Sequence, residues 1–429
     1  MSRRFGVAWF ALVPLLLAAL AVGGVLFLRQ GGFAPYRVPA GATHPLTATP
    51  EQVGRGEYIA RLGICATCHT TRGGVPFTGG RAFATGYGTI HSTNLTPDAQ
   101  TGLGGWSVEE FRHTMRNGVS RHGVLYPVFP YAHFALLRDD DLDALFAYLQ
   151  QLPATARAPT PNRLEFPASW RPALVAWRML HYQPATPDGG AGESPQQRRG
   201  RYLVDGLGHC AMCHGARRSM GSLPAAGYLA GGRIPGLGWY APPLDAQQLR
   251  RYSTAELADY LRSGTSPHGT VYGPMAEVVY GSLRHLTPDD ALAMAVFLKS
   301  VPAHVAVPNS AEPAAGPNRD ADSGADLYKR HCEDCHARDG RGTDKGPPLV
   351  DAVAVTAPDP ANAVRMILYG AMPPTTAGNP RPHSMPPFVQ QLDSAEIAAV
   401  ANHIRMTWGD RHSNLSAGDI DALHGIDVD

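Results

Sequence analysis

The hydrophobic residues of this chain recur with the spacing of amphipathic helices, and one succession of helices occurs three times. Each succession has a short helix, a Cys-x-x-Cys-His string, a second helix that ends at glycine, a loop and a closing helix. The second helices are expected at 107–118, 253–264 and 360–370, and the closing helices at 139–152, 287–301 and 394–408. Ser107 and Ser253 each precede a glutamate by three residues, which is typical of a helix N-terminus. The pattern predicts three all-α domains, at 45–155, 194–305 and 318–410.

The N-terminal segment, 1–32, contains 24 consecutive residues without a charge, between the pair Arg3 and Arg4 and the single Arg29. At about 1.5 Å per residue, such a helix spans a hydrocarbon core of about 30 Å. The paired arginines are expected to stay in the cytoplasm, so the domains would face the periplasm from a bacterial inner membrane. The alternative is a cleaved signal peptide, which leads to the same side of the membrane. We therefore expect a membrane anchor or signal at 1–32.

Composition excludes some classes of function. The 429 residues carry 37 Lys and Arg against 36 Asp and Glu, so no basic surplus exists to neutralise the phosphates of a nucleic acid. With 47 Gly and 38 Pro at 44% hydrophobic residues, the chain is expected to be folded but rich in loops. No nucleophile elbow, phosphate-binding loop, dinucleotide fingerprint or paired-carboxylate site is present, so no catalytic residues are predicted.

The six cysteines form three pairs, each with two residues between them and a histidine directly after the second. Cys-x-x-Cys-His is typical of covalent c-type haem attachment, because positions i, i+3 and i+4 of a helix share one face. Two thiols can then reach the two vinyl groups of one porphyrin while the imidazole reaches the iron. A thioredoxin-type pair or half a zinc site is the alternative, but three identical copies argue against both. The predicted attachment residues are Cys65, Cys68, Cys210, Cys213, Cys332 and Cys335, and the predicted iron ligands are His69, His214 and His336. The predicted fold class is thus all-α, with three tandem class I cytochrome c domains behind an N-terminal transmembrane helix.

The loop after the second helix is expected to supply a methionine as the sixth iron ligand, which raises the haem potential. In the second domain this residue is Met275, eleven residues after the helix-ending glycine. In the third domain we predict Met385, in a loop held extended by prolines; Met372 comes too early and Met366 falls on the helix. In the same domain, residues 346–349, which follow the Cys-x-x-Cys-His string, are expected to supply the backbone carbonyl that orients His336.

The first domain departs from this pattern, since Phe129 occupies the position of Met275. Met115 stands in the second helix where the other two domains have leucine. We hypothesise that Met115 ligates the first haem from this helix while Phe129 fills the space. Met115 could instead be a core residue only. The other candidates are His133, His113, His122 or an open coordination position.

The remaining segments connect or follow the domains. The linker 156–193 contains tryptophans at helical spacing, Trp170 and Trp177, which form an apolar stripe. The stripe either packs on its own domain or faces a partner subunit or the membrane interface. The tail 411–429 has no hydrophobic span.

The chain resembles the three-haem cytochrome c subunits of periplasmic membrane-bound dehydrogenases, such as those for alcohols and gluconate. The resemblance covers about 45–410 and rests on the strings at 88–98, 101–107, 126–131, 238–242 and 273–275. Members of the alcohol and gluconate type have methionine at the position of Phe129. With phenylalanine at this position, the chain is more similar to cytochromes that accompany molybdenum hydroxylases. The string at 161–167 also resembles those cytochromes.

The resemblance implies a partner dehydrogenase subunit that oxidises substrate, and quinone or a terminal oxidase as the acceptor. The chain would carry electrons through three haems c and would have no substrate chemistry of its own. The alternative is an enzyme in which an open haem in the first domain acts on peroxide or another small ligand. Phe129 is the feature that supports this alternative.

Overall fold

The computed structural model describes short stretches between residues 14 and 41, then 47–182, 192–304 apart from residue 219, and 321–424. The chain folds into two compact units. The first comprises 1–57 and 69–187, and the second comprises 58–68 and 188–429. The second unit contains two of the predicted haem domains, 194–305 and 318–410. The division into three haem domains stays a prediction.

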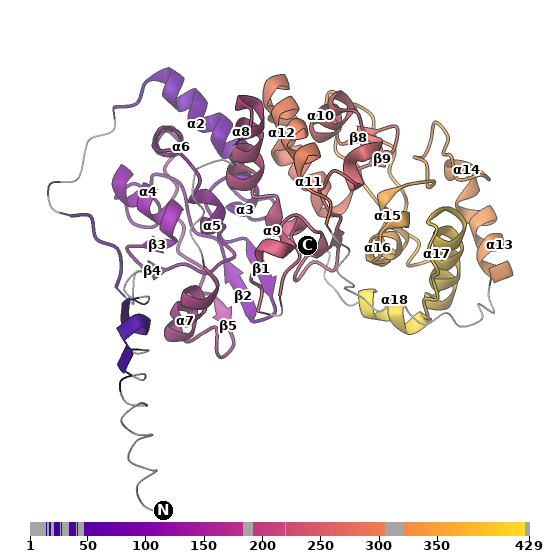
Figure 1. Ribbon diagram of the computed structural model, residues 1–429, viewed down its shortest axis with the longest axis horizontal. Helices are drawn as coiled ribbons and strands as arrows, with labels where there is room; N and C mark the ends of the chain where they lie inside the picture. Colours follow the sequence, from indigo (N-terminus) through magenta and orange to yellow (C-terminus); the bar gives the residue numbers. More distant parts are fainter. Residues whose placement is uncertain are drawn as a thin grey trace, which may run out of the picture. The chain divides into compact units, whose positions relative to one another are not determined.

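The first unit combines short helices with short antiparallel strands. Its helices are α4 (Val108–Asn117), α5 (Tyr131–Phe134), α6 (Asp139–Gln150) and α7 (Arg171–His181), together with the first part of α2 (Pro50–Leu62). One sheet has the order β1-β2-β5, formed by Ala82–Thr85, Gly88–His91 and Arg163–Leu164. A hairpin of β3 (Val119–Ser120) and β4 (Gly123–Val124) follows α4 (Figure 1).

The second unit holds the end of α2, α3 (Cys65–Cys68) and all elements from α8 onward. Its helices up to residue 300 are α8 (Pro195–Arg201), the π-helix η1 (Tyr202–Leu207), α9 (Ala211–His214), η2 (Ala225–Gly227), η3 (Gln248–Arg251), α10 (Thr254–Ser263), α11 (Gly273–Gly281), η4 (Leu283–His285) and α12 (Pro288–Ser300). The later helices are α13 (Ala321–His331), α14 (Glu333–His336), α15 (Val353–Thr356), α16 (Ala361–Tyr369), α17 (Ser394–Trp408) and α18 (Ala417–His424). Two antiparallel hairpins complete it, β6 (Gly232–Arg233) with β7 (Tyr240–Ala241) and β8 (Thr265–Ser266) with β9 (Gly269–Thr270).

The caps of α4 and α10 explain where these helices begin and end. The Ser107 hydroxyl accepts a hydrogen bond from the Glu110 backbone N–H at 3.2 Å, and Ser253 forms a complete capping box. Each helix ends at a glycine in the left-handed conformation, Gly118 and Gly264. The helices predicted from 107–118 and 253–264 are thus confirmed.

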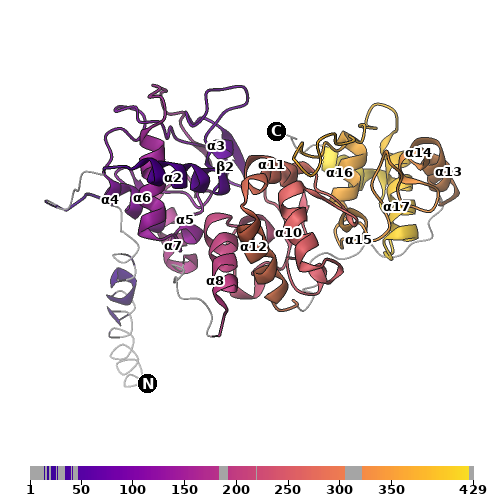
Figure 2. The ribbon, with the colours of Figure 1, turned by 90° about the horizontal axis from the view of Figure 1, so that it is seen from above.

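A glycine in the first helix of each predicted domain lies against the backbone of its closing helix. The three pairs are Gly56–Ala144, Gly200–Ala293 and Gly324–Ala399. A β-carbon on the glycine would lie 1.9 to 2.4 Å from the alanine carbonyl oxygen, closer than any real contact. α12 accordingly runs alongside α8, and α17 alongside α13 (Figures 1 and 2). These close contacts hold the first helix of each predicted domain, which precedes the Cys-x-x-Cys-His string, against the closing helix.

The fold class predicted from the sequence is wrong in two respects. The chain is not all-α, because antiparallel strands occur in both units. The strands were missed because most are two residues long, which is too short for an alternating pattern. The transmembrane helix expected within 1–32 has no counterpart either. Among the residues that the structure describes, no helix is long and apolar enough to cross a membrane, and most of 1–32 lies outside them.

Candidate haem-binding sites

The histidine of each Cys-x-x-Cys-His string is oriented by a backbone carbonyl. The ring Nδ1 lies 2.6 Å from the carbonyl oxygen of Thr93 for His69, 2.8 Å from that of Pro242 for His214, and 2.8 Å from that of Pro347 for His336. A carbonyl can only accept, so Nδ1 carries the proton and Nε2 keeps its lone pair. Burial lowers the pKa of all three histidines, partly offset by these hydrogen bonds. The three imidazoles are therefore neutral, as iron ligation requires.

A glycine fixes the backbone of each of these histidines as well. The histidine carbonyl oxygens accept hydrogen bonds from Gly79, Gly231 and Gly342, at 2.7, 2.8 and 3.0 Å. All three glycines have φ between 74° and 80°, and each packs against the segment that carries the orienting carbonyl. The side chain and the backbone of each histidine are thus held by two hydrogen bonds, and this pair of hydrogen bonds occurs three times, although the segments 79–93, 231–242 and 342–347 that supply it differ in length.

The cysteines lie in or beside short helical turns, α3, α9 and α14. None of the six forms a disulfide in the described ranges. Burial raises the pKa of Cys65, Cys210 and Cys332 to about 12, which favours the protonated thiol at each position. Ile64 and His209 directly precede a first cysteine and have left-handed φ of 52° and 38°. Such backbone is costly and persists only where the surrounding structure enforces it.

Met275 lies on a short helix rather than in the loop that the sequence predicts. It is the third residue of α11, which begins at Gly273 with φ of 53°. A β-carbon on Gly273 would lie 2.9 Å from the Trp239 ring, so tryptophan and glycine fix the start of this helix. Trp239 also lies three residues before Pro242, which orients His214. Trp239 therefore connects the segment that orients His214 with the start of the helix that carries Met275, the two predicted ligands of the second haem.

Met385 lies in an extended segment, as predicted. Its backbone pairs with Ala371 through two hydrogen bonds of 2.8 and 3.1 Å, directly after α16. Its side chain packs partly buried against the core formed by α13, α16, α17 and α18. Met372 is 75% exposed. The structure thus fixes the backbone of Met385 and leaves Met372 directed to solvent.

Met115 lies on the buried face of α4, with a side chain only 7% exposed. Phe129 is partly buried, with its ring centroid 5.5 Å from that of Phe134. His113 stacks on Tyr36 at 3.6 Å between ring centroids, and His122 is exposed in the turn between β3 and β4. Burial suits a ligand and a core residue equally, so Met115 as sixth ligand stays a hypothesis.

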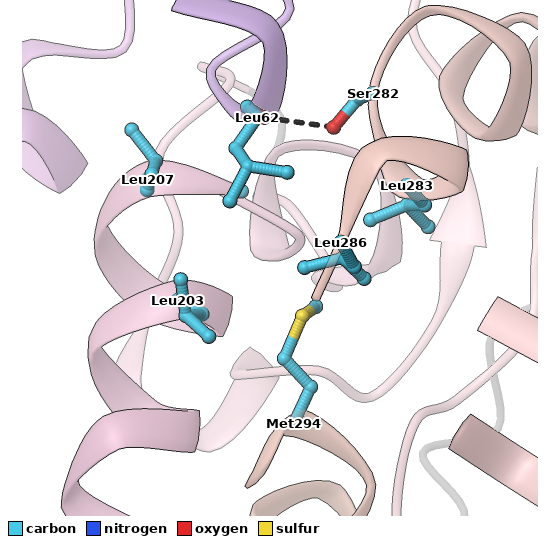
Figure 3. Close-up of a pocket in the computed structure, with 8 residues that line it drawn as sticks. Leu62, Leu203, Leu207, Ser282, Leu283, Leu286 and Met294 are labelled. Carbon is cyan, nitrogen blue, oxygen red and sulfur yellow. Dashed lines mark hydrogen bonds between the residues drawn. The ribbon is translucent and has the colours of Figure 1, made fainter. Parts of the chain in front are cut away.

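A small apolar pocket in the second unit offers no reactive side chain. Figure 3 shows it lined by apolar side chains from α2, η1, η4 and α12, with Ser282 as the one polar side chain of the lining. The Ser282 hydroxyl donates to the Leu62 carbonyl at 2.8 Å and is therefore occupied. Within the described part of the chain, no cluster of three His, Cys, Asp or Glu could hold a metal ion.

Sequence reasoning found one of the three orienting carbonyls and missed two. The predicted segment 346–349 is confirmed by Pro347, whereas Thr93 and Pro242 were not found. The sequence did contain a signal for them. Downstream of each Cys-x-x-Cys-His string, the orienting residue is followed two positions later by leucine, in Thr93-Asn-Leu, Pro242-Pro-Leu and Pro347-Pro-Leu. The repeated Gly-Gly-Arg at 79–81 and 231–233 was a second signal.

The residues present fit a covalently bound porphyrin: paired thiols in or beside a helical turn, followed by an oriented neutral imidazole. This arrangement defines a c-type cytochrome. The Cytochrome c family model matches residues 321–408. The chain is 36% identical over 400 residues to the gluconate 2-dehydrogenase cytochrome c subunit of Pantoea cypripedii, covering 86% of this chain and 89% of that one. It is 36% identical over 409 residues to the alcohol dehydrogenase (quinone) cytochrome c subunit of Gluconobacter oxydans, covering 90% and 85%.

A further similarity, 38% over 361 residues, is to a subunit of the nicotinate dehydrogenase of Pseudomonas putida, covering 82% of this chain and 30% of that one. This protein belongs to the family of cytochrome c subunits of dehydrogenases. The resemblance expected from the sequence is thereby confirmed.

Proposed function

We propose that the chain binds three haems c and carries electrons from a catalytic dehydrogenase subunit to quinone or a terminal oxidase. The observation that carries this proposal is the pair of hydrogen bonds, one to the ring and one to the backbone, that holds His69, His214 and His336 alike. A site built three times with the same hydrogen bonds is suited to the same chemistry three times. Bound haem would supply an iron that gains and loses one electron.

The residues of the chain would hold each haem rather than act on a substrate. The cysteine pairs would attach it, and the histidines would ligate the iron through Nε2. Met275 and Met385 would be the sixth ligands of the second and third haems, and Met115 that of the first. Methionine ligation, burial and hydrogen bonding to the histidine are the properties through which a protein sets a haem potential.

The partner would be of the molybdenum hydroxylase type or of the alcohol or sugar-acid type. Phe129 and the similarity to the nicotinate dehydrogenase subunit support the first, and the similarity to the gluconate and alcohol subunits supports the second. Quinone as acceptor is supported by the name of the Gluconobacter oxydans relative.

We also propose that the haem-bearing part lies on the periplasmic side of the bacterial inner membrane. The paired Arg3 and Arg4 before an uncharged segment support this location. Cell fractionation would test it: recovery of the haem-bearing chain with the periplasm or its membrane supports the proposal, and recovery with the cytoplasm contradicts it.

Absorption spectra with and without carbon monoxide test whether the chain is an electron carrier. Three low-spin haems per chain that ignore carbon monoxide are expected, because each iron then has two protein ligands. If one third of the haem is high-spin and binds carbon monoxide, the first domain has an open iron, and the enzyme alternative is favoured instead.

A further inference from the structure

Arg365 on α16 is a fully buried cation with unused hydrogen-bond donors. Its relative exposure is 0%. Nη1 donates to the carbonyl oxygen of Leu423 at 3.2 Å, but Nε and Nη2 have no hydrogen-bond partner among the described residues. Burying a guanidinium without partners for its N–H groups is costly, so such groups almost always have a hydrogen-bonding or ionic partner. The position therefore calls for an acceptor that the residues described by the structure do not provide.

Two aromatic rings flank the guanidinium. Its central carbon lies 5.2 Å from the centroids of both Trp239 and Tyr369. The Tyr369 hydroxyl donates to the His424 carbonyl at 2.7 Å and is therefore engaged elsewhere. Neither ring can neutralise the charge. The carboxylate of Asp359, just before α16, is already paired with Arg233.

The flanking Trp239 places Arg365 beside the second haem site. Trp239 belongs to the segment that ends in Pro242, whose carbonyl orients His214. The same ring packs against Gly273, two residues before Met275. Trp239 and the guanidinium thus lie beside the two segments that would hold the second haem through His214 and Met275.

Hydrogen bonds fix α16 against this region. Asn362, one turn before Arg365, exchanges two hydrogen bonds with the backbone of Tyr240, at 2.8 and 2.9 Å. Its Nδ2 also lies 3.2 Å from the hydroxyl of Tyr272, next to Gly273. The helix that carries Arg365 is thus held in register with the segments that carry both predicted ligands of the second haem.

We propose that Arg365, from the third predicted domain, binds a propionate carboxylate of the haem attached in the second. The two unused donors, Nε and one Nη, match the two-pronged geometry by which arginine binds a carboxylate. Binding would compensate the buried charge and tie the two domains together through the cofactor. The inference rests on the proposed function, because it requires a haem at Cys210 and Cys213.

Potentiometric titration of the full chain with Arg365→Gln tests this assignment. Removing the cation leaves the propionate charge uncompensated, which favours ferric iron, so the midpoint potential of the second haem should fall. Arg365→Lys keeps the charge and should give a smaller fall. The second haem is identified as the one whose potential drops when Met275 is replaced by His. Arg250→Gln removes an exposed arginine of η3 in the same predicted domain and serves as the control, with no change in potential expected.

Unchanged potentials in Arg365→Gln, with all haems bound, would overturn the inference and leave the proposed function intact. Absence of haem from the second motif of the unaltered chain would overturn both. Should Arg365→Gln fail to fold, redox-difference infrared spectra of the unaltered chain and Arg365→Lys, with ¹³C-labelled propionates, decide the matter. If the carboxylate band of the second haem differs between the unaltered chain and Arg365→Lys, the contact is supported. If the band is the same in both, the contact is contradicted.

Discussion

Met115 occupies the buried face of α4 in the one domain whose loop has phenylalanine in place of methionine. Replacing it with alanine removes the thioether that we expect on the first iron. One third of the haem should become high-spin and bind carbon monoxide, as absorption spectra would show. The truncation should also cost about 2–5 kcal/mol in unfolding free energy, as for other buried methionines.

Met294→Ala is the matched control, because Met294 is equally buried in α12 and lines an apolar pocket. It should lose stability without a spectral change. If Met115→Ala keeps three low-spin haems that ignore carbon monoxide, Met115 is a core residue, and His133 is the next candidate.

Asp205 in the π-helix η1 gives the second unit a pH-dependent stability. Burial raises its pKa to about 6, although the Tyr228 hydroxyl and Arg201 oppose the shift. The folded chain then holds this proton more tightly than the unfolded chain. Stability should fall as the pH rises from about 4 to about 6 and stay reduced above that range.

Asp205→Asn should remove this loss and stabilise the chain at pH 7 by up to about 3 kcal/mol. Denaturant unfolding between pH 4 and 7 measures the effect. Asp259→Asn, at an exposed position of α10, should change little. If the unfolding free energy of Asp205→Asn varies with pH as that of the unaltered chain does, the Asp205 carboxyl does not cause the pH dependence.

At the scale of elements, the glycine contacts between first and closing helices determine how closely the helices approach. Gly200→Ala would put a methyl group 2.0 Å from the Ala293 carbonyl oxygen and 2.6 Å from the Phe297 β-carbon. The helices must then separate, and denaturant unfolding should show a loss of about 1–3 kcal/mol, typical of overpacking.

Gly54→Ala is the control for the same substitution within a helix, because nothing lies within 4 Å of the position that its β-carbon would take. It should stabilise by about 1 kcal/mol, since alanine favours the helix. Equal effects of the two substitutions would contradict the role assigned to the crossing.

The helices were predictable because their periodicity and caps are local properties of the sequence. Ser107 and Gly118, for example, mark both ends of α4 through their residue types alone. The orienting carbonyls of Thr93 and Pro242 were not found, because a backbone acceptor leaves no requirement on its own side chain. The burial of Arg365 was not predictable either, because arginine is usually a surface residue and the burial depends on contacts with Trp239 and α18, which are distant in sequence.

At the scale of the whole molecule, the central claim is that this one chain carries three haems. The haem motifs use all six cysteines, and their histidines are held by the same pair of hydrogen bonds. Covalent attachment makes the count a property of the chain that survives denaturation.

The most direct test is therefore the intact mass of the purified, denatured chain. The account predicts the polypeptide mass plus three haems, with the added mass on the peptides that contain Cys65–Cys68, Cys210–Cys213 and Cys332–Cys335. A mass with two haems or fewer, from cells that attach haem fully to other cytochromes c, would contradict it.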